Sequence, residues 1–254
     1  MEALIVVLVG LALGSFLNVV IHRVPKRMSL VMPPSTCPKC GKRIKPYDNI
    51  PVLSFLVLGG KCRFCRAPIS PSYPLVELAT GLTFLLLWSR FDLTPAFFAS
   101  CVFSGGLIAL SVIDFYHQIL PEVITFPLIG LSFGWSFLRP GGGFLQALWG
   151  AAAGAGFLLL VYGLYYLLRK KEGLGLGDVI LMVLVGSFLG WKLTVLTLIL
   201  ASFVGALVGI FLMAFRKKDL QHALPFGTFL GPAAIAALVW GDRIIAAYLS
   251  LFQK

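Results

Sequence analysis

The chain has 254 residues, of which 59% are hydrophobic and only 12% charged, and this composition excludes an ordinary soluble domain. Its net charge of +11 comes from lysines and arginines gathered in a few connections, which indicates membrane topology and attraction to anionic lipid rather than nucleic-acid binding. The composition therefore predicts an all-α polytopic membrane protein.

Eight apolar runs are long enough to cross the hydrocarbon core as helices. In chain order, the predicted spans are Ala3–Ile21, Pro74–Ser89, Pro95–Ile113, Leu120–Leu138, Phe144–Leu168, Val179–Gly190, Leu193–Phe215 and Thr228–Leu249. The first lacks the basic start and small-residue end of a cleavable signal, so we expect it to stay in the protein. The sixth is the shortest, and we expect it to use part of the preceding glycine-rich turn or to enter the membrane only part-way.

Lysine and arginine predict the orientation of these spans. Residues 23–66 hold ten of them, and residues 169–171 and 216–218 hold three each, which together make sixteen of the 21 in the chain. Cytoplasmic connections carry the excess of positive charge in membrane proteins. We therefore expect these three segments to face the cytoplasm and both chain ends to face outward.

The one sizeable polar segment, residues 22–73, contains two C-x-x-C pairs separated by 21 residues. They are Cys37 with Cys40 and Cys62 with Cys65. This spacing predicts a tetrahedral four-thiolate zinc site. The metal would be structural, because about fifty residues build little core of their own. The alternatives are a pair of disulfides, which a reducing compartment disfavours, and a thioredoxin-like role, for which the strand-and-helix context is missing.

The sequence thus predicts three parts. Residues 1–21 form the first transmembrane helix, residues 22–73 a small cytoplasmic zinc-binding module, and residues 74–254 a seven-helix transmembrane domain. Asn18 and Glu77 lie in the spans on either side of the module. We expect them to make hydrogen bonds between helices, with contact to a substrate or a methyl donor as the alternative.

Two aspartates are the candidate catalytic residues. Asp114 ends the third span and Asp178 begins the sixth, and the alternation of spans puts both at the cytoplasmic face. A carboxylate at the edge of hydrocarbon usually has a partner or a task. Two close carboxylates can hold one proton between them, so that one acts as base and the other as acid toward a water molecule. The alternative is two separate helix caps, since Asp is a favoured N-cap residue.

Two glycines, Gly175 and Gly177, come just before Asp178. We expect them to allow a close backbone approach and positive φ angles, both of which a side chain resists. Such a turn can also expose backbone groups that pair with an extended peptide. The alternative is a flexible connector.

Together these motifs resemble a known family, the bacterial type IV prepilin peptidases, which are prepilin leader peptidases and N-methyltransferases. The G-x-G-D element at residues 175–178 is similar to the signature that these enzymes share with presenilin-type aspartyl proteases. The other matching stretches are Gly14–Pro25, Pro33–Thr36 with the first cysteine pair, Asp48–Pro51, Gly60–Arg63, Ile69–Ser70, Tyr73–Pro74 and Val76–Leu78.

The resemblance implies an enzyme of the bacterial inner membrane, with both termini periplasmic and the active site at the cytoplasmic face. Its substrates would be prepilins or pseudopilins of type IV pilus or type II secretion systems. Asp114 and Asp178 would cleave the leader after a glycine, and S-adenosylmethionine would methylate the new N-terminus. Structural zinc would be held by Cys37, Cys40, Cys62 and Cys65. No nucleotide fingerprint marks the methyl-donor site, so its residues stay unassigned.

The chain departs from the family pattern at two positions. Glu122 stands where the family commonly has aspartate, and we expect it to support the pair together with Gly175 and Gly177. Thr228 stands where proline is frequent, and we expect this change to affect backbone stiffness rather than chemistry.

Two other functions remain open. In a proton-coupled transporter, the two aspartates would relay protons, but such acids lie near the middle of the bilayer at broken helices. A membrane-anchored zinc module that binds a secretion partner without turnover would leave the G-x-G-D element unexplained.

Overall fold

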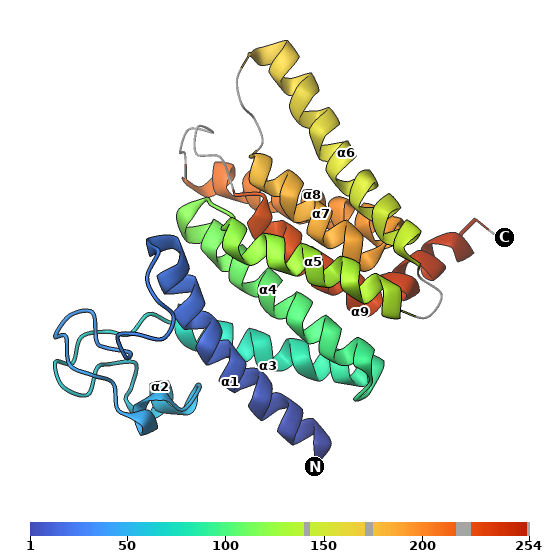
Figure 1. The fold of residues 1–254 in the computed structure, drawn as a ribbon. Coiled ribbons are helices and arrows are strands. Elements are labelled where there is room, and N and C mark those ends of the chain that lie inside the picture. Colours follow the sequence, from blue (N-terminus) through green and yellow to red (C-terminus); the bar gives the residue numbers. More distant parts are fainter. Residues whose placement is uncertain (140–142, 171–174, 217–224, 253–254) are drawn as a thin grey trace. The chain divides into compact units, whose positions relative to one another are not determined.

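The computed structural model describes residues 1–139, 143–170, 175–216 and 225–252, and in these ranges its regular elements are all helices, with no strand (Figure 1). The helices are α1 Glu2–Arg23, α2 Leu53–Val57, α3 Ser72–Phe91, α4 Pro95–His117, α5 Glu122–Leu138, α6 Phe144–Arg169, α7 Leu176–Leu189, α8 Trp191–Arg216 and α9 Gly227–Ser250. Two 3-10 turns, Val24–Lys26 and Pro46–Asn49, lie in the polar segment. The prediction of an all-α protein is confirmed.

Each of the eight predicted spans corresponds to one long helix. Five of these helices, α1, α4, α6, α8 and α9, are long and apolar enough to cross a membrane by length and composition, and α5 and α7 are shorter apolar helices. α3 is less apolar, because Glu77, Thr80 and Thr83 lie on its buried side. The short helix α2 was not predicted.

Helix contacts divide the chain into two compact units, Met1–Ala109 and Leu110–Lys254, with the boundary inside α4. In the first unit, α1 and α3 pack closely through glycines. A Cβ on Gly10 would lie 2.9 Å from Gly81 Cα, and one on Gly14 would lie 2.7 Å from Glu77 Cα. Small residues four apart let helix backbones approach in this way. Beyond them, the Asn18 side-chain amide donates to the Tyr73 carbonyl at 3.0 Å, which confirms the predicted hydrogen bond between helices.

The polar segment between α1 and α3 folds as two copies of one turn. In the first copy, the Cys37 N–H donates to the Lys42 carbonyl at 2.9 Å. In the second, 25 residues later, the Cys62 N–H donates to the Ala67 carbonyl at 2.8 Å. An isolated antiparallel bridge closes each turn. The repeat aims two cysteines from each copy at the same point.

In the second unit, α7 is the buried centre, in contact with α5, α6, α8 and α9 (Figure 1). Its residues Leu181, Met182, Leu184 and Val185 are completely buried. A helix that is apolar on every side can be stable when neighbours enclose it. This enclosure explains why α7 carries only one charged residue, Asp178.

The closest approach in this unit joins α6 and α7. A Cβ on Gly150 would overlap the carbonyl oxygen of Gly186, and a Cβ on Gly186 would overlap that of Gly150. Backbone atoms cannot move aside as a flexible side chain can, so both positions require glycine.

This contact generates a stability prediction. We expect Gly150→Ala to lower the free energy of unfolding by about 1–3 kcal/mol, because the methyl group forces α6 away from α7. Gly156→Ala is the matched control on the same helix, since a Cβ there meets nothing within 4 Å. The measurement is the midpoint of thermal unfolding in detergent, and equal midpoints for the two variants would contradict the packing.

Candidate functional site

The two predicted catalytic aspartates lie in the second unit, on different helices. Asp114 is in the last turn of α4, and Asp178 is in the first turn of α7. Their side chains are only 5% and 8% exposed, although each is within one turn of a helix end. Two buried carboxylates need hydrogen-bond donors.

The donors for Asp114 come from the start of α9. The backbone N–H of Thr228 donates to Asp114 Oδ2 at 2.8 Å, and the Thr228 hydroxyl lies 3.3 Å from the same oxygen. The Ser111 hydroxyl, one turn earlier on α4, donates to the Gly227 carbonyl at 3.3 Å. The first turn of α9 is therefore bonded to the last turn of α4.

Gly227 brings the two carboxylates together. A Cβ at this residue would lie 2.9 Å from Asp114 Oδ2 and 3.2 Å from Asp178 Oδ1. The backbone amides of Gly227 and Gly175 also interact with the Asp178 carboxylate. One oxygen of each carboxylate therefore lies close to the same backbone carbon, so the two acids form a pair beside Gly227. The interpretation of the aspartates as two unrelated caps does not fit this geometry.

The two glycines before Asp178 have ordinary φ angles, and what distinguishes them is the absence of a side chain. Gly175 has φ −76° and ψ 137°, and Gly177 lies within α7, so the expectation of positive φ was wrong. Close approach is found at Gly177, where a Cβ would lie 3.3 Å from the Leu120 side chain. A Cβ on Gly175 would make only an ordinary contact, 3.7 Å from Asp178 Oδ2.

Two other predicted residues have different outcomes. Glu122 is the first residue of α5 and is exposed, and no hydrogen bond to either aspartate is found for it in the described ranges, so its supporting role stays a prediction. Thr228 was expected to affect only backbone stiffness, and this was wrong, because it donates to Asp114. The signal available in the sequence was a glycine followed by a threonine, Gly227 and Thr228, at the start of the last span.

The four predicted metal ligands meet in the first unit. The sulfur atoms of Cys37, Cys40, Cys62 and Cys65 all lie within 4.8 Å of one another, and the sulfurs of Cys37 and Cys65 are 3.8 Å apart. All four are free thiols, so the disulfide alternative is not what the structure shows. The cluster could hold a metal ion.

The backbone around this cluster favours a thiolate. The N–H groups of Cys65 and Phe64 point toward the Cys62 sulfur and lower the pKa of that thiol to about 6. The N–H of Ala67 acts in the same sense on Cys65, but burial and the three neighbouring sulfurs outweigh it and raise the pKa of Cys65 to about 11. These N–H groups favour one thiolate in the cluster, and a bound cation would balance the negative charge of further thiolates.

Known protein families match residues in both units of the chain. A model of the bacterial peptidase A24 N-terminal domain matches residues 8–91, and a model of the type IV leader peptidase family matches residues 101–210. A prepilin leader peptidase/N-methyltransferase of Pseudomonas aeruginosa is 40% identical, over 96% of this chain and 92% of the relative. The chain belongs to the type IV leader peptidase family.

Two further relatives of the family carry the same description. The one from Stutzerimonas stutzeri is 39% identical over 94% of this chain and 91% of its own length, and the one from Aeromonas salmonicida is 38% identical over 97% and 93%. No solved structure matches. The second family match includes both Asp114 and Asp178 but ends before Gly227 and Thr228.

The cysteine cluster generates a prediction about metal content. We expect one metal ion per chain, and we expect Cys37→Ser/Cys62→Ser to lose it, because two of the four sulfurs are removed. Cys101→Ser is the control, since Cys101 is buried in α4 outside the cluster. Elemental analysis by plasma mass spectrometry decides this, and undiminished metal in the double variant would contradict the assignment.

Proposed function

We propose that this protein is a membrane aspartyl endopeptidase that removes the leader of type IV prepilins or pseudopilins after a glycine and then methylates the new N-terminal amine. The observation that carries the proposal is the meeting of Asp114 and Asp178 at Gly227. The similarity to prepilin leader peptidase/N-methyltransferases over nearly the whole chain supports it.

The two carboxylates have complementary tasks in this reaction. One is ionised and takes a proton from water as the water oxygen attacks the glycine carbonyl carbon. The other is protonated and gives its proton to the nitrogen as the C–N bond breaks, leaving a carboxylate on the leader and an amine on the pilin. Thr228 binds Asp114 Oδ2 and so fixes the orientation of that carboxylate.

The turn before α7 is suited to hold the substrate chain. Gly175 and Leu176 are exposed beside the buried Asp178. The first N–H groups of a helix have no partner within the helix, and an extended peptide can pair with such groups. We propose that the residues around the leader glycine bind along this turn.

We propose zinc as the metal of the cysteine cluster. Zinc–sulfur bonds of about 2.3 Å in a tetrahedron place the sulfurs about 3.8 Å apart. The sulfurs of Cys37 and Cys65 have this spacing. The ion is a folding element for the segment between α1 and α3, which contains one short helix, α2, and two 3-10 turns.

We further propose that the enzyme lies in the bacterial inner membrane with residues 22–73 and the aspartates at the cytoplasmic face and both termini periplasmic. The supporting observation is the distribution of lysine and arginine. The leader and the methyl donor, S-adenosylmethionine, are available on that side. Residues 1–21 and 74–254 form the membrane part of this arrangement.

The central test of this function is substitution of each aspartate. We expect Asp114→Ala and Asp178→Ala each to abolish cleavage of a purified prepilin, and the double variant to be little worse, because the two groups act as one unit. Asp92→Ala, at an exposed aspartate after α3, is the control. Appreciable leader cleavage by either single variant would contradict the assignment of the two aspartates as the catalytic pair.

Gly227 provides a second test, independent of charge. We expect Gly227→Ala to slow cleavage on the order of 100-fold, because a methyl group displaces the carboxylates and small displacements are costly in catalysis. Gly205→Ala is the matched control, since its Cβ would make an ordinary 3.5 Å contact with Phe229. The measurement is the single-turnover rate, and equal rates for both variants would show that Gly227 does not position the pair.

A further inference from the structure

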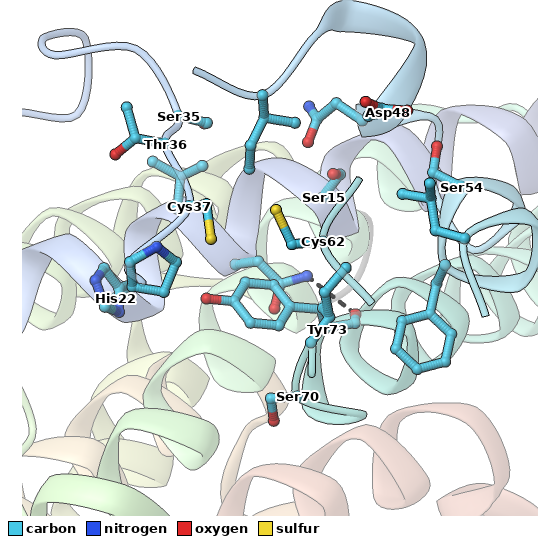
Figure 2. A pocket seen from close by; sticks show the side chains of 18 of the residues that line it. Ser15, His22, Ser35, Thr36, Cys37, Asp48, Ser54, Cys62, Ser70 and Tyr73 are labelled. Atoms are coloured by element: carbon cyan, nitrogen blue, oxygen red, sulfur yellow. Dashed lines mark hydrogen bonds between the residues drawn. The ribbon is translucent and has the colours of Figure 1, made fainter. Parts of the chain in front are cut away.

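The first unit contains a cavity of about 510 Å³ between the polar segment and the adjoining ends of α1 and α3. This volume is in the range of sites for small molecules. Figure 2 shows the Tyr73 ring extending into the cavity, with His22 at one side and the sulfurs of Cys37 and Cys62 above it. The aspartate site, in the other unit, contributes no residue to its lining.

A buried acid lies at the helix side of this cavity. Glu77 of α3 is only 8% exposed and lines the cavity. Its Oε2 accepts a hydrogen bond from the Val52 N–H at 2.7 Å, and in the described ranges no donor is found for Oε1. The Glu77 carboxylate therefore bonds to the polar segment rather than to another helix, so the predicted hydrogen bond between helices is wrong for Glu77, and Oε1 is left for a ligand.

Beside Glu77, the Asn18 side chain is held in place. Its amide nitrogen donates to the Tyr73 carbonyl at 3.0 Å, drawn as the dashed line in Figure 2. Asn18 also lines the cavity, and its carbonyl oxygen makes no hydrogen bond found in the described ranges. Two acceptors, an amide oxygen and a carboxylate, thus line this end of the cavity.

The polar segment contributes aromatic and positively charged side chains to the cavity lining. Phe55 and Phe64 join Tyr73 in the lining. The Lys42 ammonium lies 4.8 Å from the centre of the Phe64 ring, while Arg63 of the same wall is bound to Asp48 at 2.6 Å. Aromatic faces can stack on a heterocyclic base, and a lysine ammonium can bind a carboxylate.

A ligand that matches this lining carries a cation, an aromatic base and a carboxylate. S-adenosylmethionine has all three, as sulfonium and ammonium groups, adenine and an amino-acid carboxylate. A basic leader peptide fits less well, because Arg23, Lys39, Lys42 and Arg43 line the cavity and the acid Asp48 is already paired.

We propose that this cavity is the site of the methyl donor, S-adenosylmethionine, with Glu77 supplying the negative charge for its sulfonium group and Tyr73 a ring for its adenine. The inference rests on the proposed methyltransferase activity. In that reaction the pilin amine forms an N–C bond to the methyl group as the C–S bond breaks, the sulfonium becomes a neutral thioether, and the amine proton goes to solvent.

The proposal gives the cysteine cluster a second role. Cys37 and Cys62 belong both to the cluster and to the cavity lining. The metal that fixes these residues also fixes one wall of the donor site. Removing the metal then weakens donor binding as well as folding of the segment.

The test is direct binding to the full-length protein in detergent, without prepilin. By calorimetry, we expect Glu77→Gln to weaken binding of S-adenosylmethionine about tenfold or more, because a contact with a charged group is lost. Binding of S-adenosylhomocysteine, which lacks the sulfonium charge, should weaken less. Glu2→Gln is the matched control on an exposed glutamate, and Asp178→Asn should bind both compounds as the unaltered protein does.

A second measurement does not depend on how the variant folds. An azido-adenine analogue of S-adenosylmethionine, photolysed on the unaltered protein, should label peptides within residues 15–77. Label confined to α5–α9, or unchanged affinity in a Glu77→Gln variant that retains its metal, would overturn the cavity assignment while leaving the proposed function intact. A protein that cleaves prepilin yet neither binds the donor nor transfers a methyl group would refute the methyltransferase function itself.

Discussion

The rest of the second unit depends on one constraint: a carboxylate buried among apolar helices must receive hydrogen bonds. Here the backbone at the start of α9 supplies them, because the first N–H groups of a helix have no partner within it. Thr228 binds Asp114, and Gly227 reaches both acids without a side chain that would separate them. The enclosed helix α7 fixes Asp178 from the other side, so the paired acids result from helix packing rather than from a loop.

The first unit follows a different principle. Its polar segment has little core, and its shape comes from two repeated turns that aim four sulfurs at one point. Glycines between α1 and α3 bring the two ends of this segment together, and Asn18 bonds across them. Hydrolysis requires only water and the aspartates, whereas methyl transfer requires a donor, and the proposed division assigns the donor to the unit with the large cavity.

The sequence was sufficient to predict the eight apolar helices and the residues of the aspartate and cysteine groups, because long apolar runs and paired C-x-x-C motifs are local signals. It was less accurate at helix ends: α4 continues to His117 and α7 begins at Leu176, since polar or glycine residues can extend a helix beyond its apolar run. The bond between Thr228 and Asp114 joins residues 114 apart, and no local pattern indicates such a contact. The cavity beside Glu77 is likewise a product of tertiary packing.

The claim that water, activated by two carboxylates, attacks the prepilin is tested most directly with water labelled with oxygen-18. In a single turnover with enzyme in excess, mass spectrometry should find one labelled oxygen in the carboxylate of every released leader and none in Asp114 or Asp178. Label in either aspartate, or a leader covalently attached to the enzyme, would show that an aspartate attacks the carbonyl itself and would contradict the account.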